Sequence, residues 1–277
     1  KDIFSNMPQN VTQIRSSQFP DKSIREISLL THSKVISSKT VNKKLGFLRT
    51  FLGWCVNNGY CSENTLDKVK VITPRRQARE ERDAFSQPEM QIILHAANEE
   101  NEDWKKLVTY MGAYSGLRLN EICQLYLDDI IDEEGIWCFR ITDERDDQHL
   151  KTLNSKRLVP IHQSILDLRL LSLIDLPSND RLFPDLSLTD NNYGDKAGRW
   201  FNRTFLKNLG LKTPKKVFHS LRHTFITELK QNQTPEPIAK AIAGHTEQSI
   251  TYSRYGGDYQ LQTLKDEIDK VCFTSNN

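Results

Sequence analysis

The sequence predicts a mainly α-helical protein with a small antiparallel β-sheet, organised in two domains. Apolar residues recur at helical spacing in several stretches, most clearly in 40–58 and 219–231. The stretch 127–162 instead contains short β-rich runs separated by turn residues. A charged segment without apolar periodicity lies between the two helical regions and predicts a linker.

The first domain is expected over residues 1–72 and is helical. In TVNKKLGFLRTFLGWCVNN, 40–58, the apolar positions form one stripe, and Gly59 ends the helix. We expect one or two further helices in 9–30, broken around Pro20, and a short capped helix or a turn in SENTLDKV, 62–69. Residues 73–85 are predicted to be a basic linker.

The second domain is expected over residues 86–277. Ser86 and Glu89 have capping-box spacing, and Pro88 lies in the first turn, so a helix begins there and continues to about Ala97. The runs LDDIID, GIWCFRIT and RLVPIH predict the strands of the sheet. Further helices are expected over 102–115, 163–175, 194–209, 219–231 and 236–243, with another in the apolar stripe of the tail, 258–272.

The composition favours a soluble globular protein. Hydrophobic residues make up 37% and charged residues 27% of the chain, which excludes a disordered or a membrane protein. No apolar run reaches the ~18 residues of a transmembrane helix, and Lys1 in place of Met indicates a fragment or a processed form. The five cysteines are scattered without a CxxC pair, which predicts reduced thiols in a cytoplasmic protein rather than disulfides or a zinc ribbon.

The segment 34–79 is strongly basic, although the net charge of the chain is only +2. It contains ten lysines and arginines and two acidic residues, so the remainder of the chain is mildly acidic. This asymmetry indicates a polyanionic partner, with a solvated helical face as the alternative. The candidates for contact with such a partner are Lys39, Lys43, Lys44, Arg49, Arg75 and Arg76.

The stretch AYSGLRLNEICQL, 113–125, contains charged residues at a predicted junction between two helices. Gly116 ends the first helix, and Arg118 follows at the junction, where it can point into a cleft. Glu121 lies three residues later and can pair with Arg118. A surface ion pair of little energetic value is the alternative interpretation.

The stretch LKTLNSKRLVPIH, 150–162, predicts a basic hairpin. Lys151 lies on its ascending side, and Lys156 and Arg157 lie on its descending side. A hairpin lysine can reach into a groove, although a solvated hairpin is the simpler interpretation of this stretch alone.

The stretch HSLRHTFITEL, 219–229, predicts a helix with His219, Arg222 and His223 on one face. Two histidines four residues apart could bind a metal. The glutamate that follows the first histidine in a metalloprotease helix is replaced by Ser220, and an arginine between the histidines would repel a cation. We therefore expect no metal.

Taken together and in this order, the motifs resemble a tyrosine recombinase of the phage-integrase type over about 86–260. The resemblance implies a helical core-binding domain followed by the catalytic domain of that family. It also implies a catalytic set that comprises Arg118 in SGLRLNE, Lys151 in the hairpin, His219 and Arg222 in HSLRH, His245 in AGH, and a tyrosine farther on.

Three tyrosines follow His245 in the stretch GHTEQSITYSRYGGDYQ. In the family the nucleophile follows this histidine by about nine or ten residues, which fits Tyr255. Many members have a gap one residue shorter, which falls here on Arg254, and this departure leaves Tyr252 as the second candidate. Tyr259 follows two glycines and is expected to pack against the domain.

The resemblance implies a reaction that these residue types can perform. Arginines make forked hydrogen bonds to the non-bridging phosphate oxygens, and the histidines bind phosphate or take the phenol proton. Lys151 is the expected general acid for the departing 5′ oxygen, and Glu121 is expected to orient Arg118 or a histidine. A 3′-phosphotyrosyl ester conserves the bond energy, so neither ATP nor a metal cofactor is required.

The expected function is site-specific recombination of double-stranded DNA for a phage or mobile element. The family resemblance implies a homotetramer on DNA, assembled through the C-terminal tail, and allows for accessory DNA-bending proteins. It also implies a cytoplasmic location, at the nucleoid of a bacterial host. A type IB topoisomerase-like enzyme and a non-catalytic DNA-binding protein are the alternatives, and the full catalytic set argues against the second.

Overall fold

The computed structural model describes residues 7–30, 32, 35–69, 83–150, 155–168, 170, 180–190, 192–244 and 259–273. The chain forms two compact units, Lys1–Glu80 and Glu81–Asn277. Residues 73–82 of the expected linker lie outside the described residues. Its last residue, Phe85, belongs to the core of the second unit, because its ring is buried and its backbone N–H donates to Thr224 Oγ1 at 2.8 Å.

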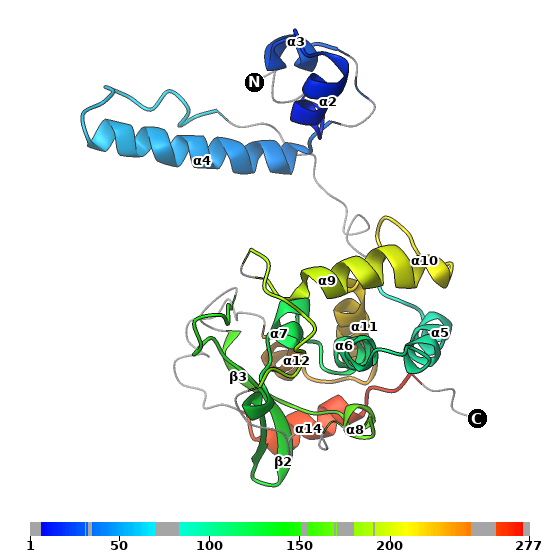
Figure 1. Ribbon diagram of the computed structural model, residues 1–277. Helices are drawn as coiled ribbons and strands as arrows, with labels where there is room; N and C mark the ends of the chain where they lie inside the picture. Colours follow the sequence, from blue (N-terminus) through cyan, green and yellow to red (C-terminus); the bar gives the residue numbers. More distant parts are fainter. Residues whose placement is uncertain are drawn as a thin grey trace. The chain divides into compact units, whose positions relative to one another are not determined.

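The described part of the first unit contains the helices α2 (Val11–Gln18), α3 (Ile24–Ser28) and α4 (Ser38–Asn57) (Figure 1). The break expected around Pro20 separates α2 from α3, and Ser23 begins α3 with a capping box. Ser37 caps α4, in agreement with the helix predicted over 40–58. Residues 65–68 form a turn, so the turn is the correct alternative for 62–69.

The helices of the second unit are close to those predicted, beginning with the capping box of Ser86 and Glu89. Their bounds are α5 (Gln87–Asn98), α6 (Asp103–Tyr114), α7 (Leu119–Cys123), α8 (Gln163–Leu166), α9 (Gly194–Arg199), α10 (Leu206–Asn208), α11 (His219–Gln231), α12 (Glu236–Ala243) and α14 (Leu261–Asp269). In the described part, the helix expected over 163–175 ends at Leu166. The Leu168 backbone N–H then donates to the Ile165 carbonyl, a three-residue contact that closes the last turn.

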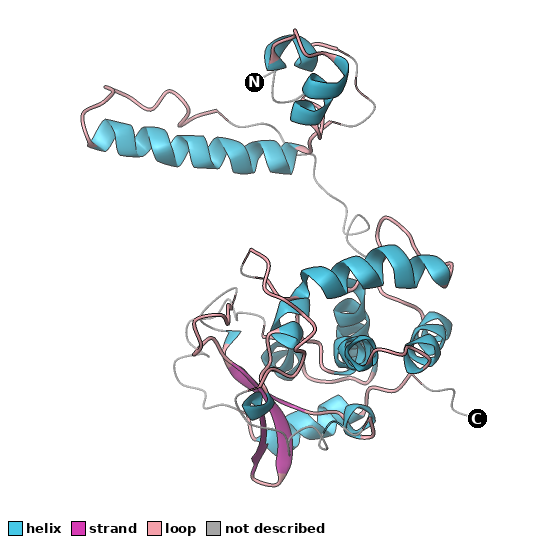
Figure 2. Ribbon diagram, in the orientation of Figure 1, coloured by secondary structure: helices cyan, strands magenta, loops and turns pink. Residues whose placement is uncertain are grey.

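The sheet has three antiparallel strands in the order β1 (Ile130–Glu133), β2 (Ile136–Ile141) and β3 (Arg157–Pro160). The 3₁₀ turn η2 (Leu127–Asp129) precedes β1, and Phe139 of β2 pairs with Ile130 on one side and Val159 on the other. Figure 2 shows the sheet at one side of the helical unit. The strand runs predicted from the sequence are therefore confirmed.

A π-helical segment, η5 (Trp200–Phe205), replaces α-helix in the middle of the element expected over 194–209. Aromatic packing accompanies this wider turn: the Trp200 and Phe205 rings lie 4.8 Å apart, and Trp104 meets Trp200 edge-on. Asn202 within η5 accepts a hydrogen bond from Phe218 N at 2.7 Å. The segment therefore fixes the beginning of α11, in keeping with the association of π-helical turns with functional sites.

The tail helix α14 packs within its own unit. Leu264, Ile268, Val271 and Phe273 are all buried in the main core, and His162 Nε2 contacts the Val271 carbonyl at 2.9 Å. The helix predicted from the apolar stripe is confirmed, and the stripe is occupied by this chain's own core. No helix in the described part of the chain is long and apolar enough to cross a membrane.

Candidate functional site

Arg222 lies at the centre of the candidate site, on α11. Leu221 and Phe225 of this helix are fully buried in the core, which fixes the rotation of the helix about its axis. Arg222 is itself only 3% exposed. Its Nη1 donates to the Gly116 carbonyl, and its Nη2 donates to the Ala243 carbonyl at 2.6 Å. The side chain thereby connects the α6–α7 turn with the end of α12.

The two histidines of α11 lie next to each other, as their spacing predicts. The rings of His219 and His223 are 4.9 Å apart and meet edge-on. His219 is exposed and His223 half-buried, whereas Arg222 turns inward. In the described part of the chain, no group of three or more His, Cys, Asp or Glu side chains could hold a metal ion.

Arg118 lies at the junction before α7, as predicted, and its residue is the N-cap of that helix. Gly116 makes the tight turn into this junction at φ +64°, and a side chain there would collide with the Phe225 ring. The Arg118 backbone N–H donates to Glu121 Oε2 at 3.0 Å, and Arg118 Nη1 donates to Oε1 at 2.5 Å. The Arg118 side chain remains 25% exposed, so part of it faces solvent.

Arg157, at the start of β3, was not among the site residues expected from the sequence. Its Nη2 donates to Glu121 Oε2 at 3.1 Å, its Nε to the Ile242 carbonyl at 3.0 Å, and its Nη1 to the Ser155 carbonyl at 2.8 Å. The side chain is 9% exposed. Its position on the descending side of the predicted basic hairpin was the available signal in the sequence.

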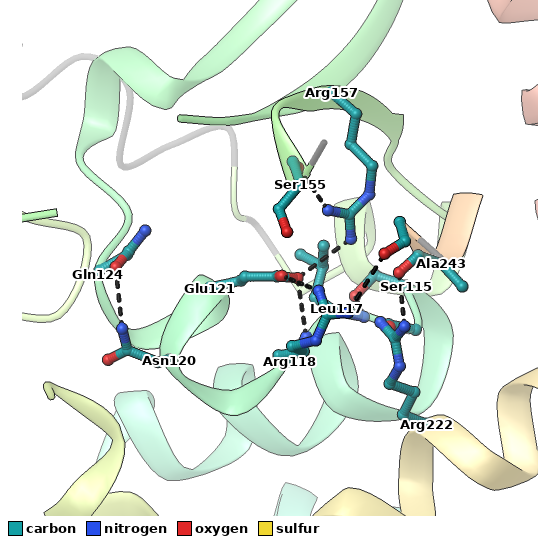
Figure 3. A network of polar contacts seen from close by, with 12 residues as sticks. Ser115, Leu117, Arg118, Asn120, Glu121, Gln124, Ser155, Arg157, Arg222 and Ala243 are labelled. Carbon is teal, nitrogen blue, oxygen red and sulfur yellow. Dashed lines mark hydrogen bonds and ion pairs between the residues drawn. The ribbon is translucent and has the colours of Figure 1, made fainter. Parts of the chain in front are cut away.

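Three arginines from three elements therefore bind three successive carbonyls at the end of α12. Arg157 binds Ile242 O, Arg222 binds Ala243 O, and Arg118 Nη2 binds Gly244 O at 3.2 Å. These carbonyls form the electron-rich end of a helix, which attracts cations. Figure 3 shows the arginines and Glu121 converging there, and we call this group the arginine cluster.

The arginine cluster is electrostatically poised for an anion. Its described members are three guanidinium groups and the carboxylate of Glu121, which leaves an excess of positive charge. Burial and then the charge of Arg118 lower the pKa of Arg222 to about 9. Burial alone would raise the pKa of Glu121, but Arg157 and the contacts with Arg118 outweigh it and hold that pKa below its ordinary value. An added anion would relieve the mutual repulsion of the arginines.

Several predicted site residues lie outside the described residues. These are Lys151, His245, Tyr252, Tyr255, Arg75 and Arg76. Of the neighbouring hairpin residues, Lys156 points outward, 48% exposed, in an ion pair with Asp143 at 2.7 Å. Tyr259 packs against the main core, as predicted.

The basic candidates of the first unit differ in how they are held. Lys39, Lys43 and Lys44 are exposed on α4, and Lys43 Nζ lies 5.7 Å from the centre of the Phe47 ring. Arg49 is half-buried, and its guanidinium donates to two carbonyls of its own unit, Leu66 O at 3.0 Å and Val69 O at 2.7 Å. The structure therefore gives Arg49 an internal role that the sequence did not predict.

Comparison with known proteins bears on the second unit above all. Residues 84–260 match the family model described as the phage integrase family. The chain is 28% identical over 247 residues to a tyrosine recombinase XerC-like protein of Caldanaerobacter subterraneus subsp. tengcongensis. That alignment covers 79% of this chain and 62% of the relative, so the chain spans less than two thirds of the relative's length.

Two solved structures have the same fold. The Tn1549 transposon integrase in complex with transposon right end DNA has a TM-score of 0.54 and 16% identity, covering 94% of this chain and 82% of that one. A lambda integrase tetramer bound to a Holliday junction has a TM-score of 0.55 and 16% identity, covering 77% and 60% of the two chains. At such identities the likeness concerns the fold.

Proposed function

Because the chain belongs to the phage integrase family of tyrosine recombinases, we propose that it is a site-specific DNA recombinase. It cleaves and rejoins DNA strands through a covalent 3′-phosphotyrosyl intermediate, in the integration and excision of a phage or mobile element. The observation that carries this proposal is the buried arginine cluster, in which Arg118 and Arg222 converge on the end of α12 with an excess of positive charge. A phosphodiester is the anion that such a cluster suits.

The arginines would bind the phosphate that undergoes the reaction. Charge increases on the non-bridging oxygens as the transition state forms, and fixed donors stabilise it without reorganisation. Arg222 is held by two carbonyls and Arg118 by a carboxylate and a carbonyl. Both guanidinium groups are therefore preorganised, and the part of Arg118 that faces solvent is the part available to DNA.

The remaining catalytic roles are assigned from the sequence motifs. The phenol oxygen of Tyr255 attacks the phosphorus, and the bond to the 5′ oxygen breaks. Lys151 supplies the proton that the 5′ oxygen takes up, while His219 or His245 accepts the phenol proton or binds the phosphate. The reverse attack by a 5′ hydroxyl of another duplex rejoins the strand, so the number of ester bonds is conserved and no ATP is consumed.

The partner is double-stranded DNA, and the solved Tn1549 integrase is likewise in complex with DNA, its transposon right end. Lys39, Lys43 and Lys44 of α4, together with Arg75 and Arg76, would contact phosphates and hold the duplex without reading its sequence. These contacts would take place in the cytoplasm of a bacterial host, at the nucleoid.

Assembly as a homotetramer on DNA follows the lambda integrase tetramer bound to a Holliday junction. The C-terminal tail is the proposed contact between protomers, and accessory DNA-bending proteins would help to shape the complex. Since the apolar stripe of α14 is buried in its own unit, a tail that joined two protomers through this stripe would have to exchange α14 between them.

A covalent trapping experiment tests the recombinase proposal. Purified protein is incubated with a pool of nicked duplexes of randomised sequence, and the DNA attached to protein after denaturation is recovered and sequenced. We expect the wild type and Tyr252→Phe to form the adduct and Tyr255→Phe to form none, because only a phenol at the correct position can attack.

The outcomes separate the alternatives. If Tyr255→Phe retains the adduct and Tyr252→Phe loses it, Tyr252 is the nucleophile. If the wild type traps no duplex from the pool, the recombinase proposal fails and a non-catalytic DNA-binding protein becomes the favoured alternative. If the recovered duplex is only resealed and never joined to a second duplex, the activity is that of a topoisomerase.

A further inference from the structure

Arg157 connects three elements that surround the proposed phosphate site. It starts from β3, reaches Glu121 of α7, and binds the Ile242 carbonyl of α12. We infer that Arg157 is a positioning residue, which fixes Arg118 and Arg222 in place without touching the phosphate. This inference rests on the proposed function and assigns a task to the third arginine of the cluster.

The geometry makes Arg157 unsuited to bind phosphate itself. Each of its three guanidinium nitrogens already donates a hydrogen bond, to Ile242 O, Ser155 O and Glu121 Oε2. Burial does not set Arg157 apart, since its side chain is 9% exposed and Arg222 is 3% exposed; the hydrogen bonds of its guanidinium group do. All three guanidinium nitrogens of Arg157 are therefore engaged with protein acceptors.

Arg157 acts on Arg118 through Glu121. Oε2 of this carboxylate accepts from Arg157 Nη2 and from the Arg118 backbone N–H, and Oε1 accepts from Arg118 Nη1. Two of the three hydrogen bonds to Glu121 thus fix the start of α7 and the direction of the Arg118 side chain. Removing one of the two cationic partners of a buried carboxylate destabilises the folded protein. We expect Glu121 to shift in response, and Arg118 to move with it.

Arg157 acts on Arg222 through the end of α12. The Ile242 carbonyl that it binds precedes the Ala243 carbonyl of Arg222 and the Gly244 carbonyl of Arg118. Gly244 has φ +64°, and a Cβ atom there would lie 2.6 Å from Arg157 Nη1. The absence of that side chain lets the guanidinium pack directly against the backbone that carries the three acceptors.

The test compares Arg157→Lys and Arg157→Met with Lys156→Met. Lys156 is the matched control, because it is the adjacent residue but points outward in an exposed ion pair. The rate of covalent trapping is measured at saturating concentration of a duplex recovered from the randomised pool, and the affinity for that duplex is measured separately. Thermal unfolding of each variant identifies any that fail to fold.

We expect Arg157→Met to slow trapping about 10–100-fold, with little loss of duplex affinity, because displaced catalytic groups act on the chemical step. Arg157→Lys retains the charge and the fold, but an ammonium group cannot reproduce the forked hydrogen bonds of a guanidinium group. Its trapping rate should therefore lie between those of Arg157→Met and the wild type, and clearly below that of the wild type. Lys156→Met should react at the wild-type rate.

Two results would overturn the inference while the recombinase proposal stands. One is that Arg157→Lys, and Arg157→Met if it folds, trap the duplex at the wild-type rate. The other is a loss of duplex affinity as large as the loss of rate, which would make Arg157 a phosphate-binding residue.

A readout that needs no DNA separates the inference from the proposed function. In the free protein, the NMR signals of the Arg118 and Arg222 side-chain N–H groups should shift in Arg157→Lys and stay in place in Lys156→Met. If the wild type traps no duplex, the recombinase proposal fails, and these signals decide the positioning role alone. Unshifted signals would contradict it.

Discussion

The arginine cluster of the second unit and the lysines of α4 in the first unit are held in opposite ways. In the second unit, Arg118, Arg157 and Arg222 are wholly or largely buried, and each donates to at least two fixed acceptors. In the first unit, Lys43 and Lys44 project from the exposed surface of α4. Guanidinium groups that cannot move suit a reaction that needs fixed donors, whereas mobile ammonium groups suit a polyanion that can bind in many registers.

Arg222→Lys should give the largest effect, because it retains the charge and removes only the fixed geometry. A lysine cannot donate at once to the Gly116 and Ala243 carbonyls and to a phosphate. We expect trapping at saturating DNA to slow about 10²–10³-fold, as for the loss of one donor to a transition-state oxyanion. Duplex affinity should change far less, and a comparable loss of both would make Arg222 mainly a binding residue.

The same comparison explains what the sequence could and could not predict. Periodicity and capping predicted α4, α5 and α11, and β-rich runs separated by turn residues predicted the strands, since these signals lie within each segment. Arg157 was visible only as a basic hairpin residue, because its partners Glu121 and Ile242 are 36 and 85 residues away in sequence. Tertiary packing also determines the position of Arg49, whose acceptors are the carbonyls of Leu66 and Val69, 17 and 20 residues ahead in sequence.

The lysines of α4 provide a second test, with a smaller effect of a different kind. Exposed phosphate contacts release counterions, so the double variant Lys43→Ala/Lys44→Ala should weaken duplex binding and reduce its dependence on salt. The slope of log affinity against log salt should fall by about one for each phosphate contact removed. Trapping at saturating DNA should stay at the wild-type rate, and a slower rate there would show that α4 contributes to the chemical step.

The smallest expected effect concerns His162, a buried polar residue of the second unit outside the arginine cluster. His162 is 5% exposed, contacts the Val271 carbonyl of the tail through Nε2, and accepts from Ser164 N through Nδ1 at 3.0 Å. This pattern requires a neutral ring that donates from Nε2. Burial lowers the pKa of His162, although the charge of Asp269 opposes the shift.

The lowered pKa makes the stability of the second unit depend on pH in a definite direction. Below the ordinary histidine pKa of about 6.5, the unfolded chain binds a proton that the folded chain does not. The contribution of His162 is therefore complete above that pH and decreases as the pH falls through the window below it, by at most about 1.4 kcal/mol per pH unit. Denaturant unfolding across this range should show the slope in the wild type and a smaller one in His162→Gln, whose amide can still donate to the tail but does not titrate. If the free energy of unfolding has the same slope against pH in both proteins, groups other than His162 cause the acid sensitivity. The contact between His162 and the tail would then not depend on the charge of the ring.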